Sequence, residues 1–395
     1  MSGQAIICGG SIGGLFAAAA LLRTGWRVDV YERSRAELSG RGAGIVTHGQ
    51  LIDALAHVGA DTDELGVETR ERAVFDKAGD VVATMDYHQI VTSWDRIHQS
   101  LRSLIPEAHH HLGKSAVDYE TGKTPRVTFD DGSVAEADLL IGADGFRSAI
   151  RARMLPQVQP AYSGYVVWRA LAKESDLPRD VHEAVFERFG FYLPAGLQII
   201  GYPIAGPGND LRPGQRRYNF VWYSQVAPDK LADMLTDATG QHHAMSIPPP
   251  FVRDDVLSAM LAAARAQLPD PFFRILEQSE RPFFTPIYDH LSPAMAKGRV
   301  ALVGDAACVA RPHVGMGVTK AAGDALTLAG LLGTGDVPGA LAAYSDTRVP
   351  AARAAYDRSR QLGDWMLLDP PGGNPDGRNN PNLHDIMRLT AIADF

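Results

Sequence analysis

The beginning of the chain constrains its fold most, because an apolar run there enters a turn that has almost no side chains. The run Ile6–Cys8 leads into the turn Gly9–Gly14, and the alanine-rich stretch Leu15–Leu22 follows at once. This order predicts a β-strand, a glycine-rich turn and an α-helix. The unpaired N–H groups and the positive dipole end of such a helix favour a phosphate close to the backbone.

A second apolar run, Val28–Tyr31, ends in Glu32, and a carboxylate at this place typically binds a ribose hydroxyl of a dinucleotide. Ser11 replaces the usual middle glycine, so that the turn also matches the G-x-S-x-G nucleophile elbow of serine hydrolases. The elbow follows earlier strands and an oxyanion-hole loop, whereas only ten residues precede Ser11. The dinucleotide turn is therefore favoured over the hydrolase.

The size and charge of the chain narrow the class of protein. Its 395 residues exceed one typical core, which predicts two domains or one large discontinuous domain. A net charge of −8 gives no sign of the basic surface that binds nucleic acid, and the apolar runs are too short to cross a bilayer. Cys8 and Cys308 lie in apolar segments and are expected to be buried free thiols. We expect a cytoplasmic protein without a membrane or nucleic-acid partner.

Two more apolar strands are followed by glycine and aspartate. Leu139–Ile141 precedes Gly142–Gly145, and Arg299–Val303 precedes the pair Gly304-Asp305. Ligands of an open α/β sheet bind beyond the carboxyl ends of its strands. Three such ends, counting the turn after the first strand, predict one long ligand that touches all of them.

The middle of the chain, from about residue 162 to 288, has a different character. Aromatic and β-branched segments alternate with Pro/Gly turns, as at Tyr165–Trp168, Leu197–Ile200 and Tyr218–Tyr223. This pattern is typical of an antiparallel sheet inserted into an α/β domain. Its aromatic side chains are expected mainly in the core of that sheet, and a linker rich in Pro, Gly and Asn is expected at 369–382.

Together these three glycine turns resemble the marks of the flavoprotein aromatic hydroxylases, the single-component FAD monooxygenases related to para-hydroxybenzoate hydroxylase. The resemblance extends over nearly the whole chain, and residues 39–47, 218–223 and 311–322 look most like hydroxypyridine hydroxylases. It implies an α/β fold with three parts: a Rossmann-like FAD-binding domain with a parallel sheet (1–72, 92–160 and 289–340), an inserted antiparallel β-sheet substrate domain (73–91 and 161–288), and a C-terminal helix and tail (341–395).

The resemblance also implies how FAD is held. Glu32 binds the adenosine ribose, the first glycine turn binds the pyrophosphate, and Asp305 contacts the ribityl and pyrophosphate region. The backbone of 315–318, which opens a helix, stabilises the anionic reduced flavin. Asp144-Gly145 serves both FAD and the passing nicotinamide donor. The expected FAD-binding residues are Gly9, Gly10, Ser11, Ile12, Gly13, Gly14, Glu32, Arg33, Arg41, Gly44, Asp144, Gly145, Gly304, Asp305, Gly315, Met316, Gly317 and Val318.

The implied reaction uses NADPH or NADH to reduce FAD, and O2 then gives a flavin C4a-hydroperoxide that hydroxylates a small hydroxylated aromatic or N-heteroaromatic ring. A base with a pKa near neutrality suits deprotonation of the ring hydroxyl, and histidine is the natural candidate. His48 follows the glycine-rich loop and His313 precedes the flavin-binding helix, so both are expected at the substrate pocket. Tyr202 is a third candidate, and a homodimer is compatible with the class.

The chain departs from the family pattern at several positions. Many relatives have His, Gln and Asn where this chain has Cys308, Met316 and Thr319, and they often have Arg in place of Trp94. The cation beside the pyrophosphate therefore remains open among three arginines: Arg33, Arg41 and Arg102.

No metal site is expected. The neighbouring histidines His109–His111 cannot all face one ion and are expected in a solvated loop. Two other functions stay open on the same fold: an FAD oxidase or dehydrogenase that inserts no oxygen, and a flavin-binding protein without turnover. An oxygen label that passes from O2 into the product would exclude the oxidase or dehydrogenase. Faster NAD(P)H oxidation in the presence of an aromatic ligand would exclude the protein without turnover.

Overall fold

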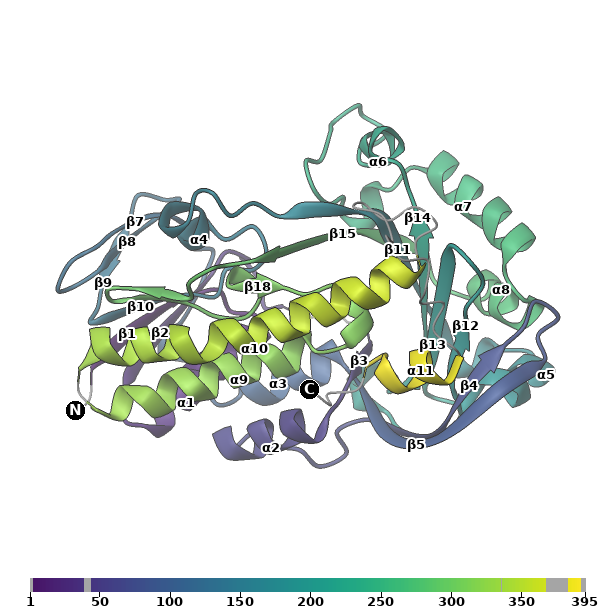
Figure 1. The fold of residues 1–395 in the computed structure, drawn as a ribbon, viewed down its shortest axis with the longest axis horizontal. Helices are drawn as coiled ribbons and strands as arrows, with labels where there is room; N and C mark the ends of the chain where they lie inside the picture. Colours follow the sequence, from purple (N-terminus) through teal and green to yellow (C-terminus); the bar gives the residue numbers. More distant parts are fainter. Residues whose placement is uncertain (1–2, 39–43, 335, 367–382, 392–395) are drawn as a thin grey trace.

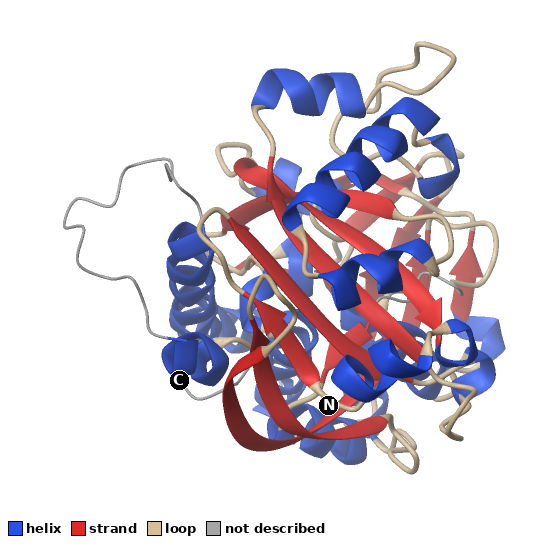
Figure 2. Cartoon of the chain, turned by 90° about the vertical axis from the view of Figure 1, so that its right-hand side faces the viewer, coloured by secondary structure: helices blue, strands red, loops and turns tan. Residues whose placement is uncertain are grey.

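The computed structural model describes residues 3–38, 44–334, 336–366 and 383–391. These residues form two large sheets, with long helices beside the smaller sheet and further helices over the larger one (Figures 1 and 2). Among them, no helix is both long and apolar enough to cross a membrane. The predicted linker at 369–382 and Arg41 lie outside the described residues.

The six-stranded sheet contains the apolar runs that precede the glycine turns. Its strand order is β16 (Ala296–Lys297), β17 (Val300–Leu302), β10 (Leu139–Gly142), β1 (Gln4–Cys8), β2 (Arg27–Glu32) and β6 (His110–Leu112). β1 pairs in parallel with β10 and β2, and β10 pairs in parallel with β17. The predicted parallel sheet is thus confirmed, and the three glycine turns lie together at its carboxyl edge.

Long helices cover this sheet. Helix α1 (Ile12–Arg23) is buried over most of its length, and its small alanine side chains allow it to pack closely on α9 (Gly317–Leu331). Helix α10 (Val337–Met366) lies along α9 (Figure 1). The other α-helices of the described residues are α2 (Gly49–Val58), α3 (Trp94–Arg102), α4 (Ala149–Met154), α5 (Arg179–Val181), α6 (Pro228–Met234), α7 (Asp254–Gln267), α8 (Asp270–Glu277) and α11 (Leu383–Leu389).

The nine-stranded sheet is the predicted insert. Its order is β18 (Cys308–Val309), β15 (Phe283–Leu291), β11 (Ala161–Lys173), β14 (Arg217–Gln225), β13 (Leu197–Ile204), β12 (Phe189–Tyr192), β4 (Val67–Phe75), β5 (Val81–Ser93) and β3 (Gly44–Val46). All neighbours are antiparallel except β12 and β4. β3 and the first half of β4 belong to this sheet, although the predicted division starts the insert at residue 73.

The two faces of the nine-stranded sheet carry different aromatic residues, as the alternation of side chains along a strand requires. Trp168, Phe220 and Trp222 belong to the core that α7 and α8 share with one face. Tyr202 and Tyr223 lie in the core of the opposite face. That second face borders the candidate site.

A small third sheet contains β7 (Ala116–Glu120), β8 (Arg126–Phe129) and β9 (Val134–Glu136).

The adjacent histidines correct one prediction. His110 and His111 belong to β6, which pairs with β2, and they are not in a solvated loop. His109 Nδ1 and His111 Nε2 lie 3.1 and 2.9 Å from the same oxygen, Oδ1 of Asp29. Despite partial burial, hydrogen bonds from these two histidines lower the pKa of Asp29. The histidines therefore fasten the edge of the parallel sheet.

Candidate active site

Close approaches of the backbone shape the first glycine turn. A Cβ on Gly9, which has a φ of +120°, would lie 2.1 Å from the carbonyl oxygen of Ala143. A Cβ on Gly14 would lie 1.9 Å from the carbonyl oxygen of Gly9. Only glycine fits these two positions. Ser11 precedes α1 as its N-cap residue, and its side chain makes no capping hydrogen bond, so the hydroxyl is available to a ligand.

Glu32 connects this turn to the end of β2. Its Oε2 accepts a hydrogen bond from Gly10 N (2.8 Å) and its Oε1 accepts one from Ser34 N (2.9 Å). The residue is 6% exposed, yet it lines the cavity described below. A carboxylate has about four lone-pair sites, so Glu32 can hold the turn and still accept a hydrogen bond from a ribose hydroxyl.

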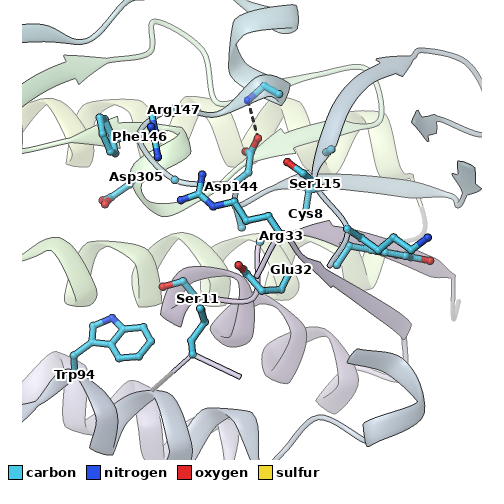
Figure 3. Close-up of a pocket in the computed structure, with 18 residues that line it drawn as sticks. Cys8, Ser11, Glu32, Arg33, Trp94, Ser115, Asp144, Phe146, Arg147 and Asp305 are labelled. Atoms are coloured by element: carbon cyan, nitrogen blue, oxygen red, sulfur yellow. Dashed lines mark hydrogen bonds between the residues drawn. The ribbon is translucent and has the colours of Figure 1, made fainter. Parts of the chain in front are cut away.

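Asp144 holds the start of a helix next to the same cavity. Its Oδ2 accepts hydrogen bonds from Ala149 N (2.7 Å) and Ile150 N (3.3 Å), at the first turn of α4 (Figure 3). Its Oδ1 is buried without a hydrogen-bond partner among the described residues. Burial raises the pKa of Asp144. Oδ2 of Asp144 therefore holds the start of α4, whereas Oδ1 can still accept a hydrogen bond from a ligand.

A cavity of 370 Å³ opens where β1, β2 and β10 end (Figure 3). The backbone of the glycine turn lies on one side, and Asp144 and Arg147 lie on the other (Figure 3). Arg33 and Lys114 also line the cavity, but Lys114 is paired with Asp131. Burial and the neighbouring Arg33 lower the pKa of Arg147. Two arginines thus supply the positive charge that a phosphate needs.

The three arginines considered as partners of the pyrophosphate differ in their position relative to the cavity. Arg33 lines the cavity. Arg102 instead pairs with Glu37 and Glu107 and does not line this cavity. Arg41 lies outside the described residues. Within the described part of the chain, the geometry therefore favours Arg33.

Two further cavities continue the first. One of 310 Å³ shares Ser11, Gly145 and Asp305 with it, and one of 240 Å³ shares Gly44, Val318 and Asp305 with the second. Asp305 thus lines all three. Joined end to end, the cavities accommodate an extended dinucleotide whose ring end reaches the third. The glycine turn, the unpartnered oxygen of Asp144 and the cationic wall fit FAD.

Most of the expected FAD-binding residues line this chain of cavities. Those that do are Gly9, Ser11, Ile12, Gly13, Glu32, Arg33, Gly44, Asp144, Gly145, Gly304, Asp305, Gly315, Met316, Gly317 and Val318. Gly10 and Gly14 shape the first turn from behind: Gly10 donates to Glu32, and Gly14 allows the approach of Gly9.

Buried charges fix the turn that carries Asp305. Asp324, which is fully buried, accepts hydrogen bonds from Gly304 N (3.0 Å) and from Arg348 Nε (2.7 Å). Lys320 Nζ donates to Gly304 O (2.9 Å) and lies 3.4 Å from Asp324 Oδ2. Burial raises the pKa of Asp305, although Lys320 opposes this shift. The Asp305 carboxyl is therefore held at the cavity by its own fixed backbone.

Aromatic rings of the larger sheet line the third cavity. Phe189, Tyr202 and Tyr223 come from β12, β13 and β14, and Arg169 on β11 lines both this cavity and the second. Burial raises the pKa of Tyr202 to about 12, although Arg169 opposes the shift. Tyr202 is therefore a neutral hydroxyl near pH 7. A cavity of 240 Å³ with such walls suits a small planar ring.

His313 lines the same cavity, and both of its ring nitrogens are hydrogen-bonded. Nδ1 lies 2.9 Å from Gln198 Oε1, and Nε2 lies 2.9 Å from the hydroxyl of Tyr165. Because an amide oxygen only accepts, Nδ1 carries the proton and Nε2 accepts from Tyr165. Burial, with a smaller effect of Arg311, lowers the pKa of His313 to about 3. The ring is therefore neutral and fixed, and it stacks on Tyr223 with centroids 4.4 Å apart.

His48 has a different place from the one expected. It is buried at the start of α2, and its Nδ1 lies 2.9 Å from Thr319 Oγ1 in the first turn of α9. It does not line any of the three joined cavities. Its hydrogen bond connects α2 to the helix whose start lines the second and third cavities.

Several cavity residues belong to no local motif. Arg169 interrupts an apolar strand, and a lone charge in such surroundings is the one signal that its sequence offers. Trp94 lines the first and second cavities and stacks on His98, with centroids 4.5 Å apart. Thr390 and Ala391 reach the third cavity from the far end of the chain, which no pattern in the sequence indicates.

Comparison with known proteins agrees with this geometry. Two family profiles match, described as FAD binding domain-like over residues 162–289 and FAD binding domain over 278–359. The chain is 34% identical over 361 residues to 2,6-dihydroxypyridine 3-monooxygenase of Paenarthrobacter nicotinovorans, which covers 90% of this chain and 89% of that protein. It is 29% identical over 407 residues to 3-amino-4-hydroxybenzoate 2-monooxygenase of Streptomyces cremeus, covering 97% and 91%. The solved structure of 2,6-dihydroxypyridine-3-hydroxylase from Arthrobacter nicotinovorans superposes with a TM-score of 0.88 at 32% identity, covering 96% of each chain.

Proposed function

Because this chain belongs to the FAD-dependent monooxygenase family, we propose that its joined cavities hold FAD together with a small hydroxypyridine-like ring. The enzyme is an aromatic hydroxylase that uses NADPH or NADH and O2. The relative with 34% identity is named for its action on a dihydroxypyridine, which supports this class of ring as the first candidate substrate.

The proposed FAD site runs along the three cavities. The first glycine turn and the start of α1 bind the pyrophosphate, Arg33 supplies the cation, and Glu32 binds the adenosine ribose. Asp305 contacts the ribityl chain, and the N–H groups of 317–318 face the flavin. When bound and reduced, FAD activates O2 and supplies the oxygen atom that is transferred to the ring.

The proposed ring site is the third cavity. Arg311 lines it but is paired with Asp289 and Asp364, whereas Arg169 has no carboxylate within ion-pair distance among the described residues. An unpaired guanidinium favours the deprotonated form of a ring hydroxyl, which makes the ring more electron-rich. Tyr202 donates a hydrogen bond to the ring, and His313 holds the wall as a neutral group.

The observation that carries this proposal is that Asp305 lines all three cavities, which joins the dinucleotide turn to an aromatic-walled cavity. The test is to purify the protein with FAD and measure NAD(P)H oxidation with a panel of hydroxypyridines and phenols under labelled O2. We expect at least one ring to stimulate oxidation and to gain a labelled oxygen atom. An unlabelled product would show an oxidase or dehydrogenase, and no stimulation by any ring would show a flavin-binding protein without turnover.

A further inference from the structure

The last described segment of the chain, Leu383–Ala391, returns to the third cavity. Helix α11 lies beside the larger sheet and contacts β5 (Figure 1). Met387 on this helix is fully buried in the core of the sheet face that borders the site. Thr390 and Ala391 follow the helix and line the cavity. One wall of the proposed ring site is thus built from the C-terminal end of the chain.

A buried arginine fastens this wall. Arg72 on β4 is 1% exposed, and its Nη1 donates to Met387 O (2.5 Å) and Thr390 O (2.6 Å). Its Nη2 donates to the side-chain carbonyl of Gln89 (2.6 Å) and to Ala391 O (3.4 Å). Burial lowers the pKa of Arg72 to about 10, so the group stays charged at neutral pH. The hydrogen bonds of the guanidinium thus go to carbonyl oxygens, and three of these oxygens lie at or just after the negative C-terminal end of α11.

Ala391 is held in a strained conformation beside the cavity. Its φ of +54° lies in the left-handed region, which a residue with a Cβ rarely adopts. Its N–H donates to His313 O (3.1 Å), and its carbonyl oxygen accepts from Gln89 Nε2 (3.0 Å). A Cβ on Gly315 would lie 2.9 Å from the Cβ of Ala391. Bonds from both sides of the cavity thus fix the position of this segment.

Thr390 has an unmatched polar group in the wall. The residue is 1% exposed, and its hydroxyl is buried without a hydrogen-bond partner among the described residues. Buried hydroxyls nearly always have a partner, because an unmade hydrogen bond is costly. A hydroxyl can both donate and accept, so it matches a ring hydroxyl, a ring carbonyl or a ring nitrogen.

We propose that Thr390 and Ala391 form one wall of the substrate site and that the Thr390 hydroxyl hydrogen-bonds a polar substituent or ring nitrogen of the substrate. Arg72 is the positioning residue of this wall. The inference rests on the proposed function, since it concerns the ring end of the same site. It makes Thr390 a specificity-determining residue, because a ring without the matching polar group gains nothing from it.

The test of Thr390 compares Thr390→Val, which removes the hydroxyl at nearly constant shape, with Thr390→Ser, which retains it. The oxidised holoenzyme is titrated with 2,6-dihydroxypyridine, or with the ring of the panel that most stimulates NAD(P)H oxidation, and the change in flavin absorbance gives Kd. We expect about tenfold weaker binding in Thr390→Val and a change of less than about twofold in Thr390→Ser. The ratio of flavin to protein should be the same in all three proteins.

The outcomes separate this inference from the proposed function. A Thr390→Val variant that binds the ring as tightly as the wild type overturns the role of Thr390 and leaves the proposed function in place. A wild-type holoenzyme that binds no ring of the panel overturns both.

The test of Arg72 uses Arg72→Met, with Arg70→Met as the matched control on the same strand, where the side chain is 80% exposed. We expect Arg72→Met to raise KM about tenfold with little change in kcat and none in flavin content. Hydrogen exchange at the amides of Thr390 and Ala391 should become faster in this variant alone. If Arg72→Met does not fold, Gln89→Leu removes the bond to Ala391 O instead. Unchanged KM and exchange in the folded variant would overturn the positioning role.

Discussion

The two ends of the chain of cavities are built in different ways. The dinucleotide end consists mostly of backbone: turns that only glycine fits, the start of a helix and two carboxylates that bind N–H groups. The ring end consists of side chains from strands β11–β14, the loop before α9 and the C-terminal segment. Arg72 and Thr390, which meet behind the ring end, are 318 residues apart. A cofactor can thus be recognised by a few short turns, each directly after a strand, whereas a particular ring is recognised by a wall assembled from many elements.

The strongest test of this comparison is Gly14→Ala at the backbone-built end. The new Cβ would lie 1.9 Å from the carbonyl oxygen of Gly9, so the turn must shift or open. We expect a loss of about 3 kcal/mol in the free energy of unfolding and almost no bound FAD. Urea unfolding and the ratio of flavin to protein measure the two effects.

Gly49→Ala is the matched control, because a Cβ there meets no atom within 4 Å. Gly49→Ala should leave both the free energy of unfolding and the ratio of flavin to protein unchanged. If Gly14→Ala also kept its FAD, the turn would not bind the pyrophosphate.

Asp305→Ala sharpens the comparison by separating cofactor binding from folding. The Asp305 carboxyl faces the cavities, while Asp324 and Lys320 hold its backbone. We expect FAD to bind between about tenfold and a hundredfold more weakly, with the melting temperature of the FAD-free protein unchanged. Asp324→Ala should lower both the affinity for FAD and the melting temperature, because it leaves the half-buried Arg348 and the buried Lys320 without their carboxylate. An Asp305→Ala protein that retains its FAD through dilution would rule out the contact.

This difference in construction also explains what could be predicted from the sequence. The turn at 9–14, Glu32, Asp144-Gly145 and Gly304-Asp305 each follow an apolar strand within a few residues, and parallel pairing brings such strand ends together. The parallel sheet and the antiparallel insert could therefore be predicted. The edge strand β6 could not be predicted because His109–His111 carry no apolar pattern. Hydrogen bonds of His109 and His111 to Asp29 hold this edge beside β2.

The ring end was less predictable for a physical reason. Proximity in sequence to the flavin-binding segments suggested His48, but the direction of its side chain depends on the packing of α2 against α9. His313 and Tyr202 do line the cavity, yet the sequence does not reveal that both nitrogens of His313 are already bonded. Thr390 reaches the site only through the long return of the C-terminal segment, which depends on the buried Arg72.

His313→Gln tests whether the ring end is built around a neutral histidine. The unfolded chain binds a proton at this residue below about pH 6.5, but burial lowers its pKa in the folded protein to about 3. Between these values unfolding takes up a proton, so stability falls as the pH falls. We expect urea unfolding of His313→Gln to show a pH slope smaller by about one proton across this window.

His290 gives the matching measurement outside the ring end. Burial, with a smaller effect of Arg151, also lowers its pKa to about 3, and it does not line the ring cavity. His290→Gln should flatten the slope similarly but leave ring binding unchanged, whereas His313→Gln should weaken ring binding as well. An unaltered acid slope in His313→Gln would mean that the histidine is already protonated in the folded protein.

The smallest effect is expected from His48→Ala, because His48 lies behind the first turn of α9. The substitution removes the hydrogen bond to Thr319 and leaves a gap between α2 and α9, so stability should fall by about 2 kcal/mol. FAD should remain bound, and hydroxylation should slow by less than about tenfold without a shift in its pH profile, because His48 lines none of the three joined cavities. A loss of a hundredfold or more, accompanied by the disappearance of an ionisation from the pH profile, would instead return His48 to the role of the base. In that case the ring end would extend behind α9, and its wall could not be fixed by the C-terminal segment alone.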